Sequence, residues 1–162
     1  MPRMGAAVLD INVRTATPAD AGAIARLVNQ AFAVERFFVN GDRTDEGEVR
    51  ALMERGGFLC AEVDGELVGC VFLEQRGARG YFGMLSVSPT RQKAGIGRLL
   101  VDRCEEHFRA AGCEAVDIKI VHLRNELPPY YRALGYRESG TAPFVDDSLK
   151  QDAHFLLMSK PL

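Results

Sequence analysis

Hydrophobic and polar positions alternate with a period of two in several short segments of the chain. This alternation, or a short apolar run bounded by turn residues, predicts strands at 11–15, 58–63, 67–75, 81–87, 115–121 and 154–159, with a further strand starting at Tyr136. The second, third and fourth of these segments are separated by Asp64-Gly65 and by the polar stretch 76–80. Such short polar connections predict an antiparallel meander.

Helical spacing takes over between these strands. Thr17, Pro18 and Asp20 supply a cap, a first-turn proline and an acid, and the apolar stripe that follows predicts a helix to about Val34. Further helices are predicted from Asp45 to the glycines at 56–57, from Gly97 to Gly112, and near 130–134, whereas 35–44 and 141–152 look irregular. The resulting order of strands and helices predicts a mixed α/β fold rather than a purely parallel doubly wound sheet.

Composition limits the class of protein further. The 162 residues include 20 Lys and Arg against 22 Asp and Glu, and 47% are hydrophobic, which is typical of one globular domain spanning 1–162. The near-neutral charge argues against a protein whose whole surface binds nucleic acid. No apolar run approaches the roughly 18 residues of a membrane span, and the first ten residues do not resemble a secretory signal. We therefore expect a cytoplasmic protein that binds neither membrane nor nucleic acid.

Cysteines and histidines give no indication of a metal site. Cys60, Cys70, Cys104 and Cys113 form no C-x-x-C pair and lie in apolar contexts, which predicts reduced, buried thiols. None of the three histidines has a partner at the spacing of metal ligands. We expect neither a metal nor a disulfide framework.

The most informative segment is the glycine-containing loop between a strand that ends at Val87 and the helix that begins near Gly97. Glycines allow the backbone amides of such a loop to converge, and a helix N-terminus adds a partial positive charge. No acid occurs between Ser88 and Val101, so the segment suits a phosphate-bearing ligand. It lacks the complete G-x-G-x-x-G of a dinucleotide fold and the Gly-Lys-Ser/Thr of a P-loop. The alternative is that Gly95 and Gly97 only shape a turn and a helix start.

Two motifs carry a resemblance to a known family. Gln92-x-x-Gly95-x-Gly97 resembles the Q/R-x-x-G-x-G/A acyl-CoA motif of the GNAT N-acetyltransferase superfamily. Farther along the chain, Tyr131-x-x-x-Gly135-Tyr136 is similar to the Y-x-x-x-G-F/Y signature of the same family. The two motifs occur in the expected order, and the strands and helices around them extend the resemblance over the whole chain.

The resemblance implies a fold, a cosubstrate and a set of binding residues. The implied fold is a central, mostly antiparallel, twisted sheet of about six to seven strands flanked by about four helices, with the fourth and fifth strands splayed apart around acetyl-CoA. The residues implied in binding acetyl-CoA are Leu85, Ser86 and Val87 for the pantetheine arm, Gln92, Lys93, Ala94, Gly95, Ile96, Gly97 and Arg98 for the pyrophosphate, and Asn125 for the cofactor arm. Asn125 lies one position closer to Tyr131 than the family's usual spacing. A homodimer is also implied.

Tyr131 is the residue that the resemblance implies as the general acid. A phenol with a pKa near 10 suits protonation of a departing thiolate whose own pKa is about 8.5. We expect the adjacent Tyr130 to face elsewhere, because neighbours on a helix point about 100° apart. The alternative is that Tyr131 only packs its helix against the sheet.

The general base is harder to place. Many family members carry an acid in the strand before the proline, but this chain has Met84 there, which cannot take a proton. Glu35, Asp45 and Glu126 are candidates, as is a chain of water molecules. An acceptor amine of low pKa is more often neutral already and depends less on a base. Alternatively, these acids are solvated or cap helices.

The resemblance also implies an acceptor pocket built by the first two helices and the irregular link between them. Phe37 and Phe38 suit its aromatic floor, with Glu35 and other acids nearby to attract a cation, unless the two rings belong to the core. Arg124 and Glu126 are expected at the mouth of the gap between the strands, where they contact substrate or form a surface ion pair.

The sequence as a whole favours an acetyl-CoA-dependent N-acyltransferase in which the amine attacks the thioester directly. The acceptor is a small-molecule amine or an amine of a protein or peptide. Two alternatives remain: a non-catalytic module that senses acyl-CoA, which the missing carboxylate at Met84 favours, and a nucleotide-binding regulator that uses Arg91 and Lys93.

Overall fold

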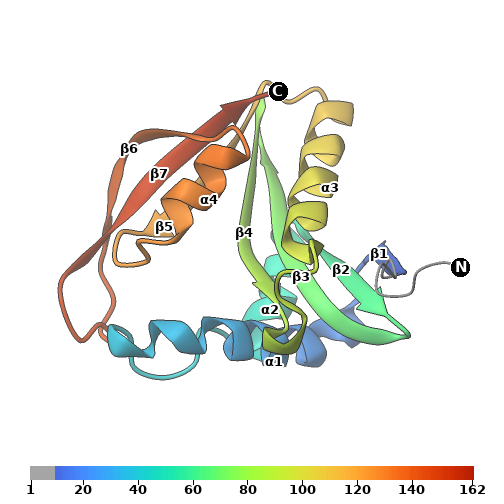
Figure 1. Ribbon diagram of the computed structural model, residues 1–162, viewed down its shortest axis with the longest axis horizontal. Coiled ribbons are helices and arrows are strands. Elements are labelled where there is room, and N and C mark those ends of the chain that lie inside the picture. The colour runs from blue at the N-terminus through green and yellow to red at the C-terminus, as the bar shows by residue number, and fades with distance from the viewer. Residues whose placement is uncertain (1–9) are drawn as a thin grey trace, which may run out of the picture.

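A seven-stranded sheet flanked by helices organises the protein (Figure 1). The computed structural model describes residues 10–162, and the sheet order is β1-β2-β3-β4-β5-β7-β6. The strands are β1 (Ile11–Thr15), β2 (Gly57–Val63), β3 (Glu66–Arg76), β4 (Arg79–Val87), β5 (Ala115–Val121), β6 (Arg137–Phe144) and β7 (Ala153–Pro161). The helices are α1 (Ala21–Ala31), α2 (Glu46–Arg55), α3 (Ile96–Ala110) and α4 (Leu127–Ala133), with 3-10 turns η2 (Pro18–Asp20), η3 (Phe32–Phe37) and η4 (Pro89–Arg91). The predicted fold class is confirmed.

Strands β4 and β5 separate soon after they meet. They are the one parallel pair in the described sheet, and they pair only where Arg79–Tyr81 lie beside Ala115–Asp117. Beyond Tyr81 the two strands diverge, as Figure 1 shows. The predicted splay between the fourth and fifth strands is therefore confirmed, and it divides the sheet into two halves.

A β-bulge in β4 lies where the strand has already left β5. Phe72 pairs with Gly83 and Cys70 pairs with Ser86, so two residues of β4 oppose one residue of β3. Met84, inside the bulge, has φ 53°, a left-handed conformation that a non-glycine residue seldom adopts. The Ser86 hydroxyl donates a hydrogen bond of 3.0 Å to the Met84 carbonyl and so stabilises the bulge. No feature of the sequence had predicted this irregularity.

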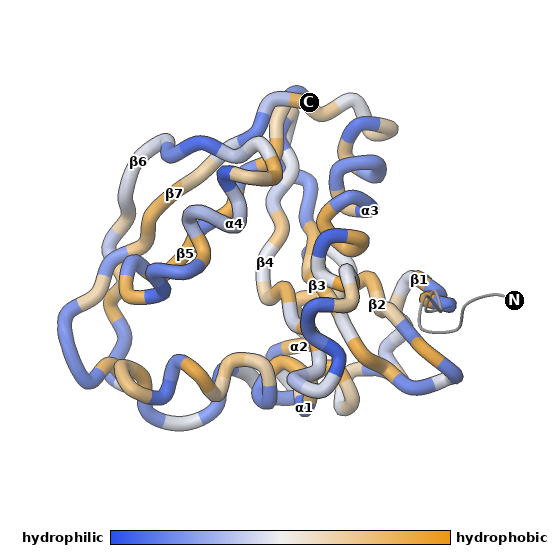
Figure 2. Tube along the Cα trace, viewed as in Figure 1, coloured by the Kyte–Doolittle hydropathy of each residue, from blue (hydrophilic) through white to orange (hydrophobic). Residues whose placement is uncertain are grey.

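Helices cover both faces of the sheet, and each face has its own core. Leu100 and Phe108 of α3 pack with Tyr131 of α4, whereas Ile24 and Val28 of α1 pack with a separate set. Figure 2 shows hydrophobic residues recurring along the strands and helices. The described helices include none with the length and apolar character needed to cross a bilayer.

Several boundaries differ from those predicted. The segment after Ala31 continues as the 3-10 turn η3, which replaces both the last turn of the predicted helix and the start of the irregular stretch. Strand β6 runs to Phe144, inside the region predicted to be irregular, because its pairing with β7 satisfies its backbone. Helix α4 begins at Leu127 rather than near 130, since Pro128 and Pro129 fit its first turn. All four cysteines are buried, as predicted.

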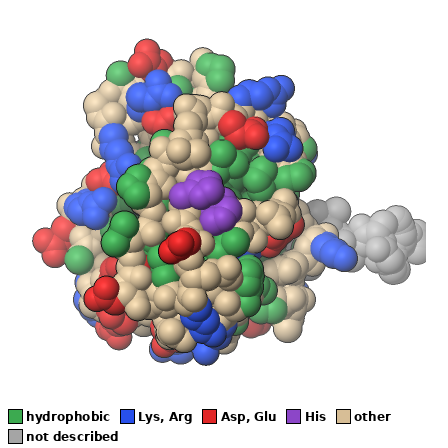
Figure 3. Space-filling view, turned by 90° about the vertical axis from the view of Figure 1, so that its left-hand side faces the viewer, with side chains coloured by type: hydrophobic (Ala, Val, Ile, Leu, Met, Phe, Trp, Pro, Cys, Tyr) green, Lys and Arg blue, Asp and Glu red, His purple; other side chains and the backbone are tan. Residues whose placement is uncertain are grey.

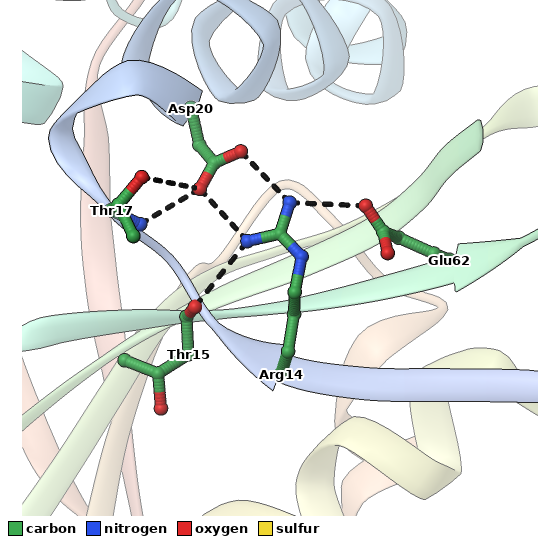
Figure 4. A network of polar contacts seen from close by, with 5 residues as sticks. All are labelled: Arg14, Thr15, Thr17, Asp20 and Glu62. Carbon is green, nitrogen blue, oxygen red and sulfur yellow. Dashed lines mark hydrogen bonds and ion pairs between the residues drawn. The ribbon is translucent and has the colours of Figure 1, made fainter. Parts of the chain in front are cut away.

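A polar network fixes the start of α1 against the edge of the sheet (Figure 4). The Arg14 guanidinium on β1 donates to both oxygens of Asp20, at 2.9 and 2.8 Å, and to Glu62 of β2 at 3.0 Å. Asp20 also accepts the Thr17 backbone amide at 2.7 Å. One arginine therefore joins two strands to the turn that leads into α1.

Close contact between α3 and β4 predicts that Gly80 tolerates no side chain. A Cβ at Gly80 would overlap the ring of Phe108, whereas a Cβ at Gly57 would meet no atom within 4 Å. We expect Gly80→Ala to destabilise the fold by about 2 kcal/mol. The matched control, Gly57→Ala, should change stability by less than about 0.5 kcal/mol. Urea unfolding measures both, and equal stability of the two variants would contradict this packing.

The network around Arg14 predicts a contribution to stability that depends on pH. Hydrogen bonds from Arg14 hold the pKa of Asp20 well below its usual range. The pair therefore contributes its full stability above about pH 4 and loses it progressively as the pH falls further. We expect Asp20→Asn to cost about 1 kcal/mol at pH 7, with the difference from the parent narrowing below pH 4. Unfolding curves over pH 2–7 test this.

The matched control for that experiment is Asp42→Asn. Asp42 pairs with Arg36 at 3.0 Å, but both side chains are well exposed. Such a pair contributes little, so the control should follow the parent at every pH. If Asp20→Asn were less stable than the parent by the same amount at every pH, the charge of Asp20 would not be the source of the stabilisation.

Candidate active site

A cavity of about 810 Å³ opens where β4 and β5 separate. Ile118 and Ile120 of β5 line it, and they belong to the core on the α3 side. Lys119 and Val121 line it as well, although alternate residues of a strand point to opposite faces. The cavity therefore passes through the sheet and is open to groups on both faces.

The N-terminus of α3 forms one end of this cavity. The predicted loop residues that line it are Gln92, Lys93, Gly95, Ile96, Gly97 and Arg98; Ala94 is outside the lining. The first amide to bond within the helix is that of Leu99, which donates to the Gly95 carbonyl at 3.0 Å. The amides of Ile96, Gly97 and Arg98 precede it and so have no partner within the helix.

Backbone conformation and charge make this end suitable for an anion. Lys93 and Gly95 both have positive φ, 70° and 81°, and such left-handed residues turn neighbouring amides toward a common point. The first turn of α3 contains no acid, and both Lys93 and Arg98 line the cavity. The helix dipole adds a further partial positive charge.

Strand β4 forms the wall that leads inward from this end. Gly83, Met84, Leu85 and Val87 line the cavity. Because β5 does not pair with β4 beyond Tyr81, that edge of β4 offers backbone groups to a ligand. Ser86 is fully buried and lies outside the lining.

Two adjacent tyrosines of α4 line the cavity. Tyr131 is buried against Phe82 and Tyr136, with ring centroids 6.2 and 5.9 Å away. Burial raises the pKa of Tyr131, so the phenol keeps its proton at neutral pH. Tyr130 is 39% exposed and lines the wall nearer α3, where its hydroxyl lies 3.2 Å from the position of a Cβ on Gly97. The expectation that Tyr130 faces elsewhere is wrong, because the cavity is wide enough to contact both rings.

Hydrogen bonds beyond the cavity hold Tyr131 in position. The backbone amide of Tyr136 donates to the Tyr131 carbonyl at 3.0 Å. The Tyr136 hydroxyl donates at 2.8 Å to the buried carboxylate of Glu105 on α3, which also pairs with Lys160 of β7 at 2.9 Å. The end of α4 is therefore tied to both α3 and β7.

Arg124 connects the two sides of the cavity. Its guanidinium donates to Glu35 of η3 and to Glu126 of the loop before α4, both at 2.8 Å. The Arg124 and Glu35 side chains are only 15% and 11% exposed. Burial raises the pKa of Glu35, although the Arg124 guanidinium opposes this effect. Of the three candidate bases, Glu35 is thus the one that presents a largely desolvated carboxylate.

The model of the protein family described as "Acetyltransferase (GNAT) family" matches residues 25–136, which are most of the chain. This chain belongs to the GNAT acetyltransferase family. A protein named IAA acetyltransferase from Azospirillum brasilense is 32% identical over 108 residues, which cover 65% of this chain and 67% of that protein. The resemblance stated from the two motifs is thereby confirmed.

Solved structures share the fold of this GNAT protein. The ribosomal-protein-S18-alanine N-acetyltransferase of Escherichia coli is 13% identical, with a TM-score of 0.78 and coverage of 93% of both chains. Ard1 of Thermoplasma volcanium is 16% identical, with a TM-score of 0.79 over 94% of this chain and 97% of that one. A Salmonella typhimurium structure, yncA with its cofactor acetyl-CoA, is 21% identical, with a TM-score of 0.75 over 94% of each chain.

The cavity of this GNAT protein fits acetyl-CoA, the cosubstrate that the family supports. The amides and cations at the start of α3 match a pyrophosphate, and the free edge of β4 matches the amides of a pantetheine arm. A side chain on Gly97 would crowd the wall formed by Tyr130.

Other residues proposed from the sequence lie outside the cavity lining. Phe38 is fully buried and Phe37 is 56% exposed; neither lines the cavity, whose aromatic wall on this side is Phe32. In the 3-10 turn η3, Phe32 and Glu35 are three residues apart and share the face that lines the cavity, whereas Phe37 lies off that face. Phe38 follows the turn and its ring is buried in the core. Asn125 is exposed and also outside the lining. Asp45 is the N-cap of α2, accepting the Glu48 amide at 2.8 Å.

Two histidines, uninformative in the sequence, contact each other in the fold. His122 and His154 stack with ring centroids 3.9 Å apart, and the His154 amide donates to His122 Nδ1 at 3.0 Å. Figure 3 shows histidine side chains gathered on the face that carries β6 and β7. Within residues 10–162, no group of three or more His, Cys, Asp or Glu is arranged to hold a metal ion. The histidine pair links the ends of β5 and β7.

The pairing of Arg124 with Glu35 predicts a pH-dependent effect of removing the arginine. In Arg124→Met, burial would raise the pKa of Glu35 without opposition, so ionising the carboxyl group would cost stability. We expect little loss near pH 4 and a loss of about 2 kcal/mol at pH 7.5, since a buried carboxylate without its partner is destabilising. Urea unfolding at several pH values measures the change.

Two further variants make that experiment specific. Glu126→Gln removes the other, more exposed partner of Arg124 and should cost less than about 0.5 kcal/mol. The double variant Arg124→Met with Glu35→Gln removes the buried charge and should abolish the pH dependence. A loss that stays constant from pH 4 to pH 7.5 would contradict the role given to Glu35.

Proposed function

We propose that this protein is an N-acetyltransferase, built as one domain, that moves the acetyl group of acetyl-CoA to an amine acceptor by direct attack. One observation carries the proposal. A single cavity through the split sheet connects an anion-binding helix N-terminus with a buried tyrosine and a desolvated carboxylate. The two reactants can therefore meet inside the sheet without an acyl-enzyme.

Binding of acetyl-CoA is assigned mainly to backbone groups. The amides of Ile96, Gly97 and Arg98, together with the side chains of Lys93 and Arg98, bind the pyrophosphate. Leu85 and Val87 bind the pantetheine arm through the free edge of β4. Ser86 acts indirectly, because its hydroxyl stabilises the bulge that shapes this wall.

Tyr131 acts as the general acid. Its raised pKa keeps the phenol protonated, so the hydroxyl is available as a donor throughout the neutral range. In the described part of the chain its hydroxyl has no hydrogen-bond partner, which leaves it free for the departing sulfur. A hydrogen bond that strengthens as the thiolate develops stabilises the transition state more than the ground state, and it therefore lowers the barrier.

Glu35 acts as the general base that accepts a proton from the acceptor amine. Met84 occupies the position of the carboxylate in the strand, so we assign the role to Glu35, which lines the cavity and is far less exposed than Asp42 or Glu126. A desolvated carboxylate is a better base than a solvated one. A lysine-like amine, pKa about 10.4, is neutral in only about one molecule in 2,500 at pH 7, against about one in ten for an α-amine of pKa near 8. We therefore favour acceptors with the lower pKa.

A second candidate function is a non-catalytic acyl-CoA sensor. The specific observation that favours it is Met84, since the strand supplies no proton acceptor at that position. Family relatives do not decide the acceptor, because their names include both an IAA acetyltransferase and a ribosomal-protein-alanine N-acetyltransferase. The homodimer stays a prediction.

Replacement of Tyr131 by phenylalanine tests the proposed enzyme. We expect Tyr131→Phe to lower kcat by about 100-fold and to change the affinity for acetyl-CoA by less than about threefold, because only the proton donor is lost. Tyr130→Phe, which changes the neighbouring ring in the same way, should lower kcat far less. Steady-state assays over a panel of amines and titration calorimetry with acetyl-CoA supply the two readouts.

Ligand stabilisation separates the alternatives. A ligand at about 100 times its Kd adds about 2.7 kcal/mol of stability, which thermal unfolding detects for acetyl-CoA, ATP or NAD. Stabilisation by acetyl-CoA with no turnover on any amine would favour the sensor. Preferential stabilisation by ATP or NAD would contradict acetyl-CoA as the ligand of this cavity.

A further inference from the structure

Two cations face the cavity from opposite sides at the end remote from α3. The Arg43 guanidinium, in the link between α1 and α2, lies 5.6 Å from the centroid of the Phe32 ring. The Lys119 ammonium on β5 lies 4.6 Å from the centroid of the Phe155 ring. All four residues line the cavity. An aromatic face holds a cation in place without neutralising its charge.

Lys119 has no close carboxylate among the described residues, and the nearest carboxylate to Arg43 lies at the distance limit of an ion pair. The Arg43 guanidinium approaches Glu48 only at 4.0 Å. Within residues 10–162, no carboxylate lies within 4.0 Å of the Lys119 ammonium. Partial desolvation and the nearby guanidinium of Arg43 lower the pKa of Lys119. Both groups therefore gain from a negative charge placed between them.

The acids in the same part of the cavity already have partners. Asp42 accepts from Arg36 at 3.0 Å, and Glu35 accepts from Arg124 at 2.8 Å. Asp146 accepts from the amide and the hydroxyl of Ser148, at 2.8 and 2.6 Å. Each of these acids therefore has a hydrogen-bonding partner other than Lys119 or Arg43. Figure 3 shows Lys or Arg and Asp or Glu side chains interspersed on the face that carries β6 and β7.

This positive site is separate from the one at the start of α3. Val121 pairs with Phe155, and Lys119 with Leu157, so the ring of Phe155 and the side chain of Lys119 share one face of the sheet. Ile118 and Ile120 point to the other face, where they pack in the core that contains Tyr131 and α3. A pyrophosphate bound at α3 therefore lies across the sheet from Lys119.

The walls of this end are aromatic and apolar. Phe144 stacks on Phe155 with ring centroids 4.5 Å apart and planes 7° from parallel. Val39 and Tyr81 complete the lining on the α1 side. Such walls favour an apolar or aromatic group over a highly hydrated one.

We propose that the acceptor is an amine whose apolar or aromatic body carries an anionic group such as a carboxylate, which Lys119 and Arg43 bind while the amine reaches Glu35. This inference rests on the proposed function, because it names the substrate class of the same site. Lys119 and Arg43 select against acceptors whose far end is cationic, since both would repel a further positive charge there.

Binding of the anionic group is tested without turnover. The ligands are 3-phenylpropionate and 3-phenylpropanamide, which have the same aromatic body and differ in charge. We expect the acid to bind at least tenfold more tightly than the amide to the parent protein, as measured by titration calorimetry. Lys119→Met and Arg43→Met should each abolish most of this preference, because methionine keeps an apolar chain and removes the charge.

The matched control is Arg50→Met. Arg50 lies on α2, pairs with Glu46 and is outside the cavity lining, so its loss changes the net charge by the same amount. This variant should keep the parent's preference for the acid. Equal binding of acid and amide to the parent, or a preference that survives in Lys119→Met, overturns the proposal. Thermal unfolding of Lys119→Met verifies that it is folded, and its exposed position on β5 makes that the expected result.

Turnover distinguishes failure of this inference from failure of the proposed function. The dipeptide Ala-Phe and its C-terminal amide share one α-amine and differ only in the distant carboxylate. We expect kcat/KM to be about tenfold higher for the free acid, mainly through KM, and equal for both in Lys119→Met. Acetylation of both at equal rates overturns the inference alone. Charge-dependent binding of 3-phenylpropionate with no acetylation of any amine supports the anion site and overturns the transferase.

Discussion

The architecture depends on an interruption of hydrogen bonding in the middle of the sheet. β4 and β5 share three residue pairs and then separate, which leaves backbone donors and acceptors without a strand to bond. The bulge at Met84 belongs to the same region, and the Ser86 hydroxyl maintains it. A long ligand with amide groups of its own can satisfy the free edge, so the gap is a binding surface rather than a defect. The helix N-terminus of α3 and the tyrosines of α4 are arranged around it.

Charges in the cavity are distributed according to the chemistry expected at each point. The end at α3 combines amides, a helix dipole and two basic side chains, all of one sign. The middle contains Tyr131, which burial keeps neutral. Glu35 is largely desolvated but balanced by Arg124, so the carboxylate stays in the cavity at an acceptable cost in free energy. The proposed division of the cavity into regions for binding and for proton transfer depends on this separation.

Local patterns in the sequence predicted most of the fold. The loop from Gln92 to Arg98 and the Tyr131–Gly135 segment are short, and each depends on backbone geometry that glycine spacing reveals. Long-range contacts were not predictable in this way. Glu35 and Arg124 are 89 residues apart in sequence, and periodicity does not encode which charges meet across a cavity. Phe37 was misplaced because a 3-10 turn changes which side chains share a face, and Phe38 because its ring is buried in the core.

The passage through the sheet has a consequence for the order of events. Because residues from both faces of the sheet line the cavity, the two reactants of the proposed transfer can approach from opposite faces. Each product can likewise depart on the side from which its precursor came. For the proposed transfer, such a geometry favours a ternary complex, in which donor and acceptor are held together before any bond changes.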